Sequence, residues 1–365
     1  MARYQPLSPT AQAAYAQLLD AAQAAELSRS VASLRGSFAS KQVKGRTYWY
    51  FQYTEVSGKL RQLYVGPDSE RVRALIEAQQ RNAPAAALEP LARSAMALGC
   101  EPVLPVHFRV IERLGDYGFF KAGGVLIGTH AFLALGNMLG VHWGDASRTQ
   151  DVDFAHAGKR LEIALPANIE IDADAAIESL RMGFLPLGGL DGKPGGSWLN
   201  PRDPDFQLDF LTPLHRGGMQ SYRHPQLGIV LQPLKFMEYL LQDVQQAVLF
   251  CSAGTSVVNV PHPARYALHK LIVFGERPAM RSAKANKDLQ QSAGLLAVLR
   301  ERAAWQVEEA WGDLIEGGPG WATRALRGRG VLAKVAPELD VEAWLSAPAK
   351  KRVRASTKKK AARKK

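Results

Sequence analysis

The segment Gly123-Gly124-Val125-Leu126-Ile127-Gly128-Thr129-His130-Ala131-Phe132 decides the fold of this chain. Its apolar run, 125–127, ends a candidate strand or buried segment over 119–127, and 128–139 predicts a helix that begins at a glycine-rich turn. A strand that turns directly into a helix is typical of mixed α/β proteins. The free backbone N–H groups at such a helix start, together with the Thr129 hydroxyl, favour an anion. The sequence therefore predicts an α/β core with a phosphate-binding turn at Gly128 and Thr129.

Carboxylates occur in two later segments that are otherwise apolar. Arg148-Thr149-Gln150-Asp151-Val152-Asp153-Phe154 contains a short strand pattern, and Phe206-Gln207-Leu208-Asp209-Phe210-Leu211 contains another. Alternate residues of a strand point to the same face, so Asp151 and Asp153 are expected to project together. Asp209 is a third acid between apolar neighbours, and such a group is costly to bury unless it is paired or bound to a cation.

Three carboxylates in one place indicate a divalent cation. Close acids repel one another unless a positive charge lies between them. Because hard oxygen ligands select hard cations, the sequence predicts Mg²⁺ or Mn²⁺ held by Asp151, Asp153 and Asp209. These three residues are also the predicted catalytic acids. Asp205, in a stretch that looks like a loop, remains an alternative third ligand.

A family resemblance follows from these motifs. Gly128-Thr129, Asp151-Val152-Asp153 and Leu208-Asp209-Phe210 resemble the signature of polymerase-β-type nucleotidyltransferases, which is a Gly-Ser-like turn, an Asp-x-Asp strand and a third acid on a neighbouring strand. Two features depart from that pattern. Thr replaces the commoner Ser, and the gap between the turn and the first acid is longer than usual. The matching motifs span about 121–296.

The resemblance extends to a downstream basic region. His269-Lys270-Leu271-Ile272-Val273, Arg277 and the segment 284–288 resemble the lysine-bearing helix and Lys-Asp motif of minimal nucleotidyltransferases, including toxin-type members of abortive-infection systems. It implies that Lys270, Arg277 and Lys287 bind the nucleotide, and that an antitoxin or another regulatory partner controls a toxin-type member. Alternatively, Lys270 is a solvated helix residue, and Lys284 and Asp288 pair with each other along a helix.

The composition fits a globular protein. Of the 365 residues, 47% are hydrophobic and 22% are charged, which excludes wholesale disorder. Cys100 and Cys251 are too few for a disulfide framework or a four-ligand zinc site. The most apolar stretch, 125–141, is interrupted by polar residues and falls short of the ~20 apolar residues of a membrane span. The first twelve residues show no signal-peptide pattern, so we expect a cytoplasmic protein without a membrane partner.

The positive charge is concentrated at the C-terminus. The net charge is +12, and Lys350–Lys365 contains ten Lys or Arg residues and no acid, so removing that stretch leaves +2. A run of like charges without apolar periodicity predicts disorder. One interpretation is a tether for the phosphate backbone of RNA or DNA. The other is a solvated tail that only aids solubility.

An aromatic stretch near the N-terminus is a second candidate for nucleic-acid binding. Tyr48-Trp49-Tyr50-Phe51-Gln52-Tyr53 and the segment 60–65 predict two strands, with Ser57-Gly58 as their hairpin turn. Aromatic platforms beside cations suit a base or single-stranded nucleic acid. The alternative is a hairpin whose aromatic rings pack on the core. The interleaved cations are Lys41, Lys44, Arg46, Lys59 and Arg61.

The expected fold class is α/β (α+β), with a mixed-sheet nucleotidyltransferase core. Within it, 103–111 and 119–127 are candidate strands or buried segments, and 188–197 is expected to be a glycine-rich loop. The expected divisions are N-terminal helices with the aromatic hairpin over 1–98, a catalytic core over 99–260, a helical domain over 261–347, and a basic tail over 348–365.

The function predicted from these features is metal-dependent nucleotidyl transfer, in which an NTP donates its NMP to an acceptor hydroxyl and pyrophosphate leaves. RNA, particularly a tRNA end, is the favoured acceptor, while a protein or a small molecule remains open. A different class of answer is a catalytically silent nucleic-acid-binding or regulatory protein on the same fold.

Overall fold

The computed structural model describes residues 3–32, 36–43, 45–54, 60–70, 72–73, 76–77, 84–144, 151–157, 172–188, 194–214, 218, 220–225, 227–276 and 283–346. Ser57-Gly58, Arg277 and the basic tail lie outside the described residues, so the expectations placed on them have no structural counterpart here.

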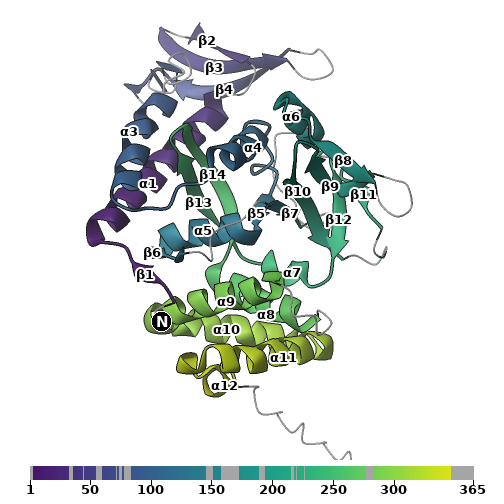
Figure 1. The fold of residues 1–365 in the computed structure, drawn as a ribbon. Coiled ribbons are helices and arrows are strands. Elements are labelled where there is room, and N and C mark those ends of the chain that lie inside the picture. The colour runs from purple at the N-terminus through teal and green to yellow at the C-terminus, as the bar shows by residue number, and fades with distance from the viewer. Residues whose placement is uncertain are drawn as a thin grey trace, which may run out of the picture.

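The core of the molecule is a seven-stranded mixed sheet (Figure 1). β10 lies in its middle, parallel to β7 on one side and to β12 on the other, and β5 runs antiparallel to β7. The predicted α/β class is confirmed. The strands are β5 (Gly124–Ile127), β7 (Val152–His156), β8 (Leu185–Gly188), β9 (Pro194–Asn200), β10 (Asp203–Pro213), β11 (Tyr222–Arg223) and β12 (Val230–Leu234).

Helices α4 (Pro105–Asp116), α5 (Gly128–Leu139) and α6 (Ala173–Ser179) accompany this sheet. α5 begins directly after β5, as the sequence predicts, and it is almost entirely buried. Of the two interpretations of 103–111, the strand is wrong, because most of the segment belongs to α4, and the buried segment is confirmed. Its buried residues recur at helical spacing, and Pro105 occupies the first helical turn, where a missing N–H costs nothing.

A second small sheet stands beside the core. β13 (Val244–Cys251) and β14 (Gly254–Pro261) form an antiparallel hairpin, and β1 (Gln5–Pro6) pairs with β6 (Val141–His142). Helices α1 (Pro9–Ala32) and α3 (Pro84–Ala97) pack against the hairpin through a hydrophobic cluster of their own. The N-terminal helices are thereby attached to the middle of the chain.

The aromatic region forms a three-stranded antiparallel sheet rather than the expected two-stranded hairpin. β3 (Arg46–Thr54) lies between β2 (Gly36–Val43) and β4 (Leu60–Pro67). The sequence of β2, GSFASKQV, is mostly small and polar and carries a weak strand signal. Pairing with the whole length of β3 nevertheless makes it a strand. Figure 1 shows this sheet at the opposite end of the molecule from the C-terminal helices.

The C-terminal third is helical, as expected, over its described residues. The helices are α7 (Met237–Leu240), α8 (Pro263–Glu276), α9 (Ala283–Arg302), α10 (Ala304–Glu316), α11 (Pro319–Val335), a 3₁₀ turn (Pro337–Leu339) and α12 (Val341–Trp344). They share one hydrophobic core with the large sheet. Over the described part of the chain, no helix combines the length and the apolar character that crossing a bilayer requires.

Candidate active site

Three adjacent strands bring Gly128, Asp153 and Asp209 together. Asp153 on β7 is in register with Asp209 on the parallel strand β10, and on its other side with Ile127, the last residue of β5. Gly128 follows Ile127 and has a φ of +63°, a conformation that glycine adopts readily. A Cβ at Gly128 would lie 1.9 Å from Asp153 Oδ2. The turn and the carboxylate are therefore in direct contact, and only glycine fits.

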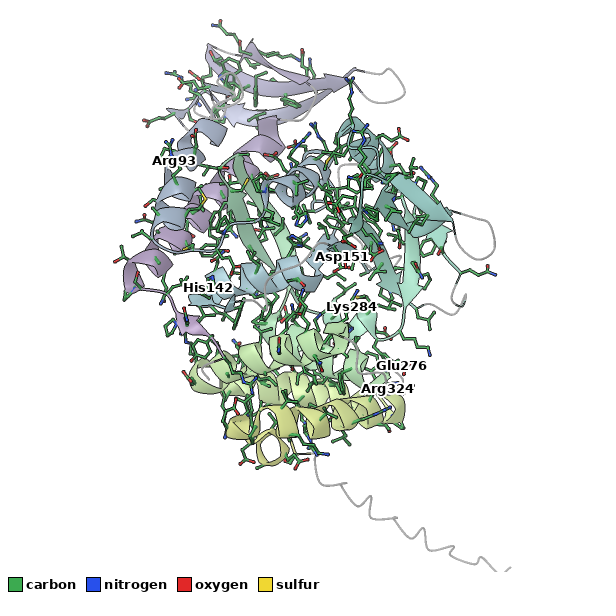
Figure 2. All side chains as sticks on the ribbon, in the orientation of Figure 1. Arg93, His142, Asp151, Glu276, Lys284 and Arg324 are labelled. Atoms are coloured by element: carbon green, nitrogen blue, oxygen red, sulfur yellow. The ribbon has the colours of Figure 1, made fainter. Side chains whose placement is uncertain are left out.

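The carboxylates influence one another electrostatically. The pKa of Asp153 is raised to about 6, first by burial and then by the negative charge of Asp209. The pKa of Asp151 is also raised, because its burial and the charge of Asp209 outweigh the attraction of Lys284. Lys284 Nζ lies 4.0 Å from Asp151 Oδ2. Figure 2 shows Asp151 at the edge of the sheet and Lys284 just below it, on the helical side.

Asp209 is held by a neighbouring strand. The Ser197 hydroxyl on β9 donates a 2.5 Å hydrogen bond to Asp209 Oδ1. Ser197 was expected in a loop, but 194–200 is a strand because it pairs with β10 on one side and with β8 on the other. The alternative acid, Asp205, is also in a strand rather than a loop, since β10 begins at Asp203. Asp205 is exposed, and its charge contributes to the raised pKa of Asp151.

The turn at Gly128 is fixed from the helical side. The Tyr266 hydroxyl on α8 donates to the Gly128 carbonyl at 2.7 Å and also lies 3.1 Å from Gln291 Oε1. Gln291 Nε2 donates to Thr129 Oγ1 at 3.3 Å. Thr129 is 7% exposed, so its hydroxyl contacts protein in this structure. Helices α8 and α9 thus hold the predicted phosphate-binding turn in place.

Lys270 forms a buried ion pair with Asp288, a side chain from the next helix. Its Nζ donates to Asp288 Oδ1 at 2.8 Å, with 16% and 6% of the two side chains exposed. The structure does not favour the alternative in which Lys284 pairs with Asp288, since Asp288 pairs with Lys270 and Lys284 lies beside Asp151. Burial alone would lower the pKa of Lys270, but Tyr266 and Asp288 raise it, so Lys270 is charged at neutral pH.

Lys287 on α9 is near enough to this pair and to Asp151 and Asp153 to interact with their charges. Burial, followed by the charge of Lys270, lowers its pKa, while Asp151 and Asp153 act in the opposite direction. Cations of α8 and α9 and the carboxylates at Asp151 and Asp153 therefore influence one another electrostatically. Nucleotide binding by Lys270 and Lys287 stays a prediction.

The donor chemistry of the site suits a hard cation. Asp151, Asp153 and Asp209 offer oxygen ligands only, and burial followed by the negative charge of Asp209 raises the pKa of Asp153. The carboxylates do not form a complete metal-binding site in this structure. Within the described ranges, no three His, Cys, Asp or Glu side chains stand close enough together to hold a metal ion. The side chains would have to converge on a cation as it binds.

Comparison with known proteins agrees with this geometry. Residues 106–316 match a family described as Nucleotidyltransferase, and the match covers more than half of the chain. The chain belongs to this nucleotidyltransferase family. Residues 14–74, which include most of α1 and the three-stranded sheet, match a domain of unknown function (DUF6788).

The structural comparison adds one solved structure, titled an antigenic nucleotidyltransferase-like protein from Paracoccidioides brasiliensis. The similarity has a TM-score of 0.30 and 15% identity, and covers 62% of this chain and 95% of that one. No curated protein matches the chain.

Sequence reasoning missed two supporting residues. Tyr266 precedes Lys270 by four positions on α8, so the two lie on one helix face, and the Lys270 ammonium is 5.1 Å from the Tyr266 ring centroid. That spacing was a usable signal. The sequence carries no such signal for Ser197, because its contact with Asp209 depends on the pairing of β9 with β10.

Proposed function

We propose that this protein is a metal-dependent nucleotidyltransferase that moves an NMP from an NTP to an acceptor hydroxyl, with RNA as the acceptor class. The observation that carries the proposal is the position of Asp153, which touches Gly128 and lies beside Asp209 on the next strand. This arrangement places acidic ligands next to the backbone N–H groups of a helix start. A metal–triphosphate complex needs both.

Each site residue has a proposed role that follows from its position. Gly128 and Thr129 begin α5, whose N-terminus favours the negative charge of a phosphate. Asp151 and Asp153 would hold the cation, which would supply charge neutralisation of the triphosphate. Asp209, aligned by Ser197, would accept the proton of the acceptor hydroxyl. The oxygen of the acceptor hydroxyl then bonds to the α-phosphorus as the bond from that phosphorus to the pyrophosphate breaks.

The cations on the helical side would act on the leaving group. Lys287 and Lys284 face the carboxylates from α9, and their charges would stabilise pyrophosphate as it departs. Lys270 is engaged with Asp288, so in this structure it supports the site through that ion pair. The role predicted for Arg277 is untested, as is control by an antitoxin.

The test is transfer of label from each of four α-labelled NTPs onto total RNA in the presence of Mg²⁺. The wild type is compared with the double variant Asp151→Ala, Asp153→Ala, and with Asp203→Asn as a control. Asp203 begins the same strand as Asp209 but lies outside the proposed ligand set. We expect label in a discrete RNA band with the wild type and the control, and none with the double variant.

Other outcomes would redirect the proposal. Label on protein would retain nucleotidyl transfer but replace RNA as the acceptor. Equal labelling by the double variant would contradict the metal assignment. No label, together with NTP binding that is indifferent to Mg²⁺, would favour a catalytically silent binding protein on the same fold.

A further inference from the structure

The two faces of the N-terminal sheet β2–β3–β4 have different chemistry. Phe38 and Phe51 are cross-strand partners with ring centroids 5.2 Å apart, and Phe51 is 5% exposed. Residues at the alternate positions of the same strands point the other way. Three of these are tyrosines, Tyr48 and Tyr50 on β3 and Tyr64 on β4. The sheet therefore has an apolar buried side and a tyrosine side.

The tyrosines form a continuous group. The ring centroid of Tyr64 lies 5.5 Å from that of Tyr50 and 6.2 Å from that of Tyr48. Tyr64 is 54% exposed, which is unusual for so large a ring, and the other two are partly exposed. Exposed, adjacent aromatic rings on a sheet form a platform for flat ligands.

Positive charge accompanies the rings. Lys41 Nζ lies 4.8 Å from the ring centroid of Tyr50 and donates to Gln62 Oε1 at 2.5 Å. Arg46, at the start of β3, is exposed. None of the described residues of β2, β3 or β4 is an acid, so no carboxylate on these strands neutralises the two cations. An anionic ligand with flat groups complements this face.

We propose that the face formed by Lys41, Arg46, Tyr48, Tyr50 and Tyr64 binds single-stranded nucleic acid. The bases would stack on the tyrosines, and Lys41 and Arg46 would contact the backbone phosphates. A duplex keeps its bases stacked on each other and offers no free base face to the rings. An acidic peptide would need the cations but not the tyrosines. This inference is independent of nucleotidyl transfer, because it concerns binding at a separate sheet.

The first experiment measures the affinity of the full chain for a short fluorescent single-stranded RNA and for the matching DNA by anisotropy. Tyr64→Ala should weaken binding about tenfold, since a base–aromatic stack is worth about 1–3 kcal/mol. Tyr64→Phe keeps the ring and should bind like the wild type. Trp305→Ala is the matched control, because Trp305 is an exposed aromatic residue on the distant helix α10, with 64% exposure.

The second experiment varies salt. Lys41→Gln should reduce the slope of log affinity against log salt by about 0.7, the expected value for one phosphate contact on a single strand. Lys334→Gln, an exposed lysine on α11, should leave the slope unchanged. Tighter binding of the RNA or of the DNA in the first experiment shows which of the two nucleic acids this face prefers.

Crosslinking locates the contact directly. A photoreactive uridine in the RNA should crosslink to the peptide that contains Tyr48 and Tyr50, or to the one that contains Tyr64. The proposal is overturned if crosslinks fall only elsewhere in the chain, if duplex binds as tightly as single strand, or if Tyr64→Phe loses as much affinity as Tyr64→Ala. Binding only of an acidic peptide would also overturn it.

Discussion

Gly128 has a φ of +63°, and a Cβ there would lie 1.9 Å from Asp153 Oδ2. Gly128→Ala therefore combines a left-handed backbone with a side-chain clash. We expect a loss of about 2–4 kcal/mol of unfolding free energy and of nucleotidyl transfer, because Asp153 must move. Chemical denaturation measures the first, and labelled transfer the second.

Gly144 is the matched control for this substitution. It has the same φ of +63°, but nothing lies within 4 Å of a Cβ placed there. Gly144→Ala should therefore lose only the backbone contribution, about 1 kcal/mol, and keep its activity. Equal losses in the two variants would show that contact with Asp153 is unimportant.

The buried pair of Lys270 with Asp288 gives a second prediction at the residue scale. Lys270→Met removes the ammonium that donates a hydrogen bond to Asp288, and we expect a loss of about 3–5 kcal/mol of unfolding free energy. The double variant Lys270→Met, Asp288→Leu should recover most of that stability, because replacing both charges leaves no buried ion. Lys235→Met, which breaks a half-exposed pair with Glu276, should lose under about 1 kcal/mol. A double variant no more stable than Lys270→Met would contradict the ion-pair interpretation.

At the scale of elements, α8 and α11 approach closely at small residues. A Cβ at Gly328 on α11 would lie 2.3 Å from the Leu271 carbonyl oxygen on α8. We expect Gly328→Ala to lower the melting temperature, because the two helices must separate. Gly330 is on the same helix, and the nearest atom to a Cβ there would be Glu342 Oε1 at 4.0 Å, so Gly330→Ala should raise stability by about 0.5–1 kcal/mol through helix propensity. The same direction of change in both variants would contradict the packing account.

Elements with a strong local signal were predictable from the sequence. The boundaries of α5 match the glycine turn and its apolar run, and the acids at 151 and 153 bracket the start of β7. The site residues that sequence reasoning grouped are near one another because strand order brings β5, β7 and β10 together. Spacing alone could not show that order.

Elements whose structure depends on distant partners were not predictable. β2 becomes a strand only through pairing with β3, and β13, which the sequence reading passed over, pairs along its whole length with β14. The segment at 105–111 has a mixed apolar pattern that permits either a strand or a helix, and burial against the core selects the helix. Lys270 meets Asp288 only because α8 and α9 lie side by side.

At the scale of the whole molecule, the buried histidines predict sensitivity to acid. Burial, followed by the charge of His156, lowers the pKa of His224 to about 4, and burial lowers the pKa of His130 and His269 to about 3. In the unfolded chain these groups bind protons near pH 6.5. The stability that these buried neutral histidines contribute is therefore fully present above pH 6.5 and is lost as pH falls from 6.5 toward 4.

This acid sensitivity can be measured by denaturant unfolding across that pH range. His224→Gln should make the pH dependence shallower by about 3 kcal/mol in total. His142→Gln is the control, since His142 is at the surface with 39% of its side chain exposed. Unfolding free energy that stays constant from pH 6.5 to 4 would contradict burial of these rings.

The central claim is that Asp151 and Asp153 hold a divalent cation against a nucleotide bound at Gly128. The measurement that tests it most directly is calorimetric binding of each NTP to the wild type and to Asp153→Asn, with Mg²⁺ and with EDTA. We expect at least one NTP to bind the wild type about tenfold or more tightly with Mg²⁺, and that difference to vanish in Asp153→Asn. An equal Mg²⁺ effect in both proteins would contradict the claim.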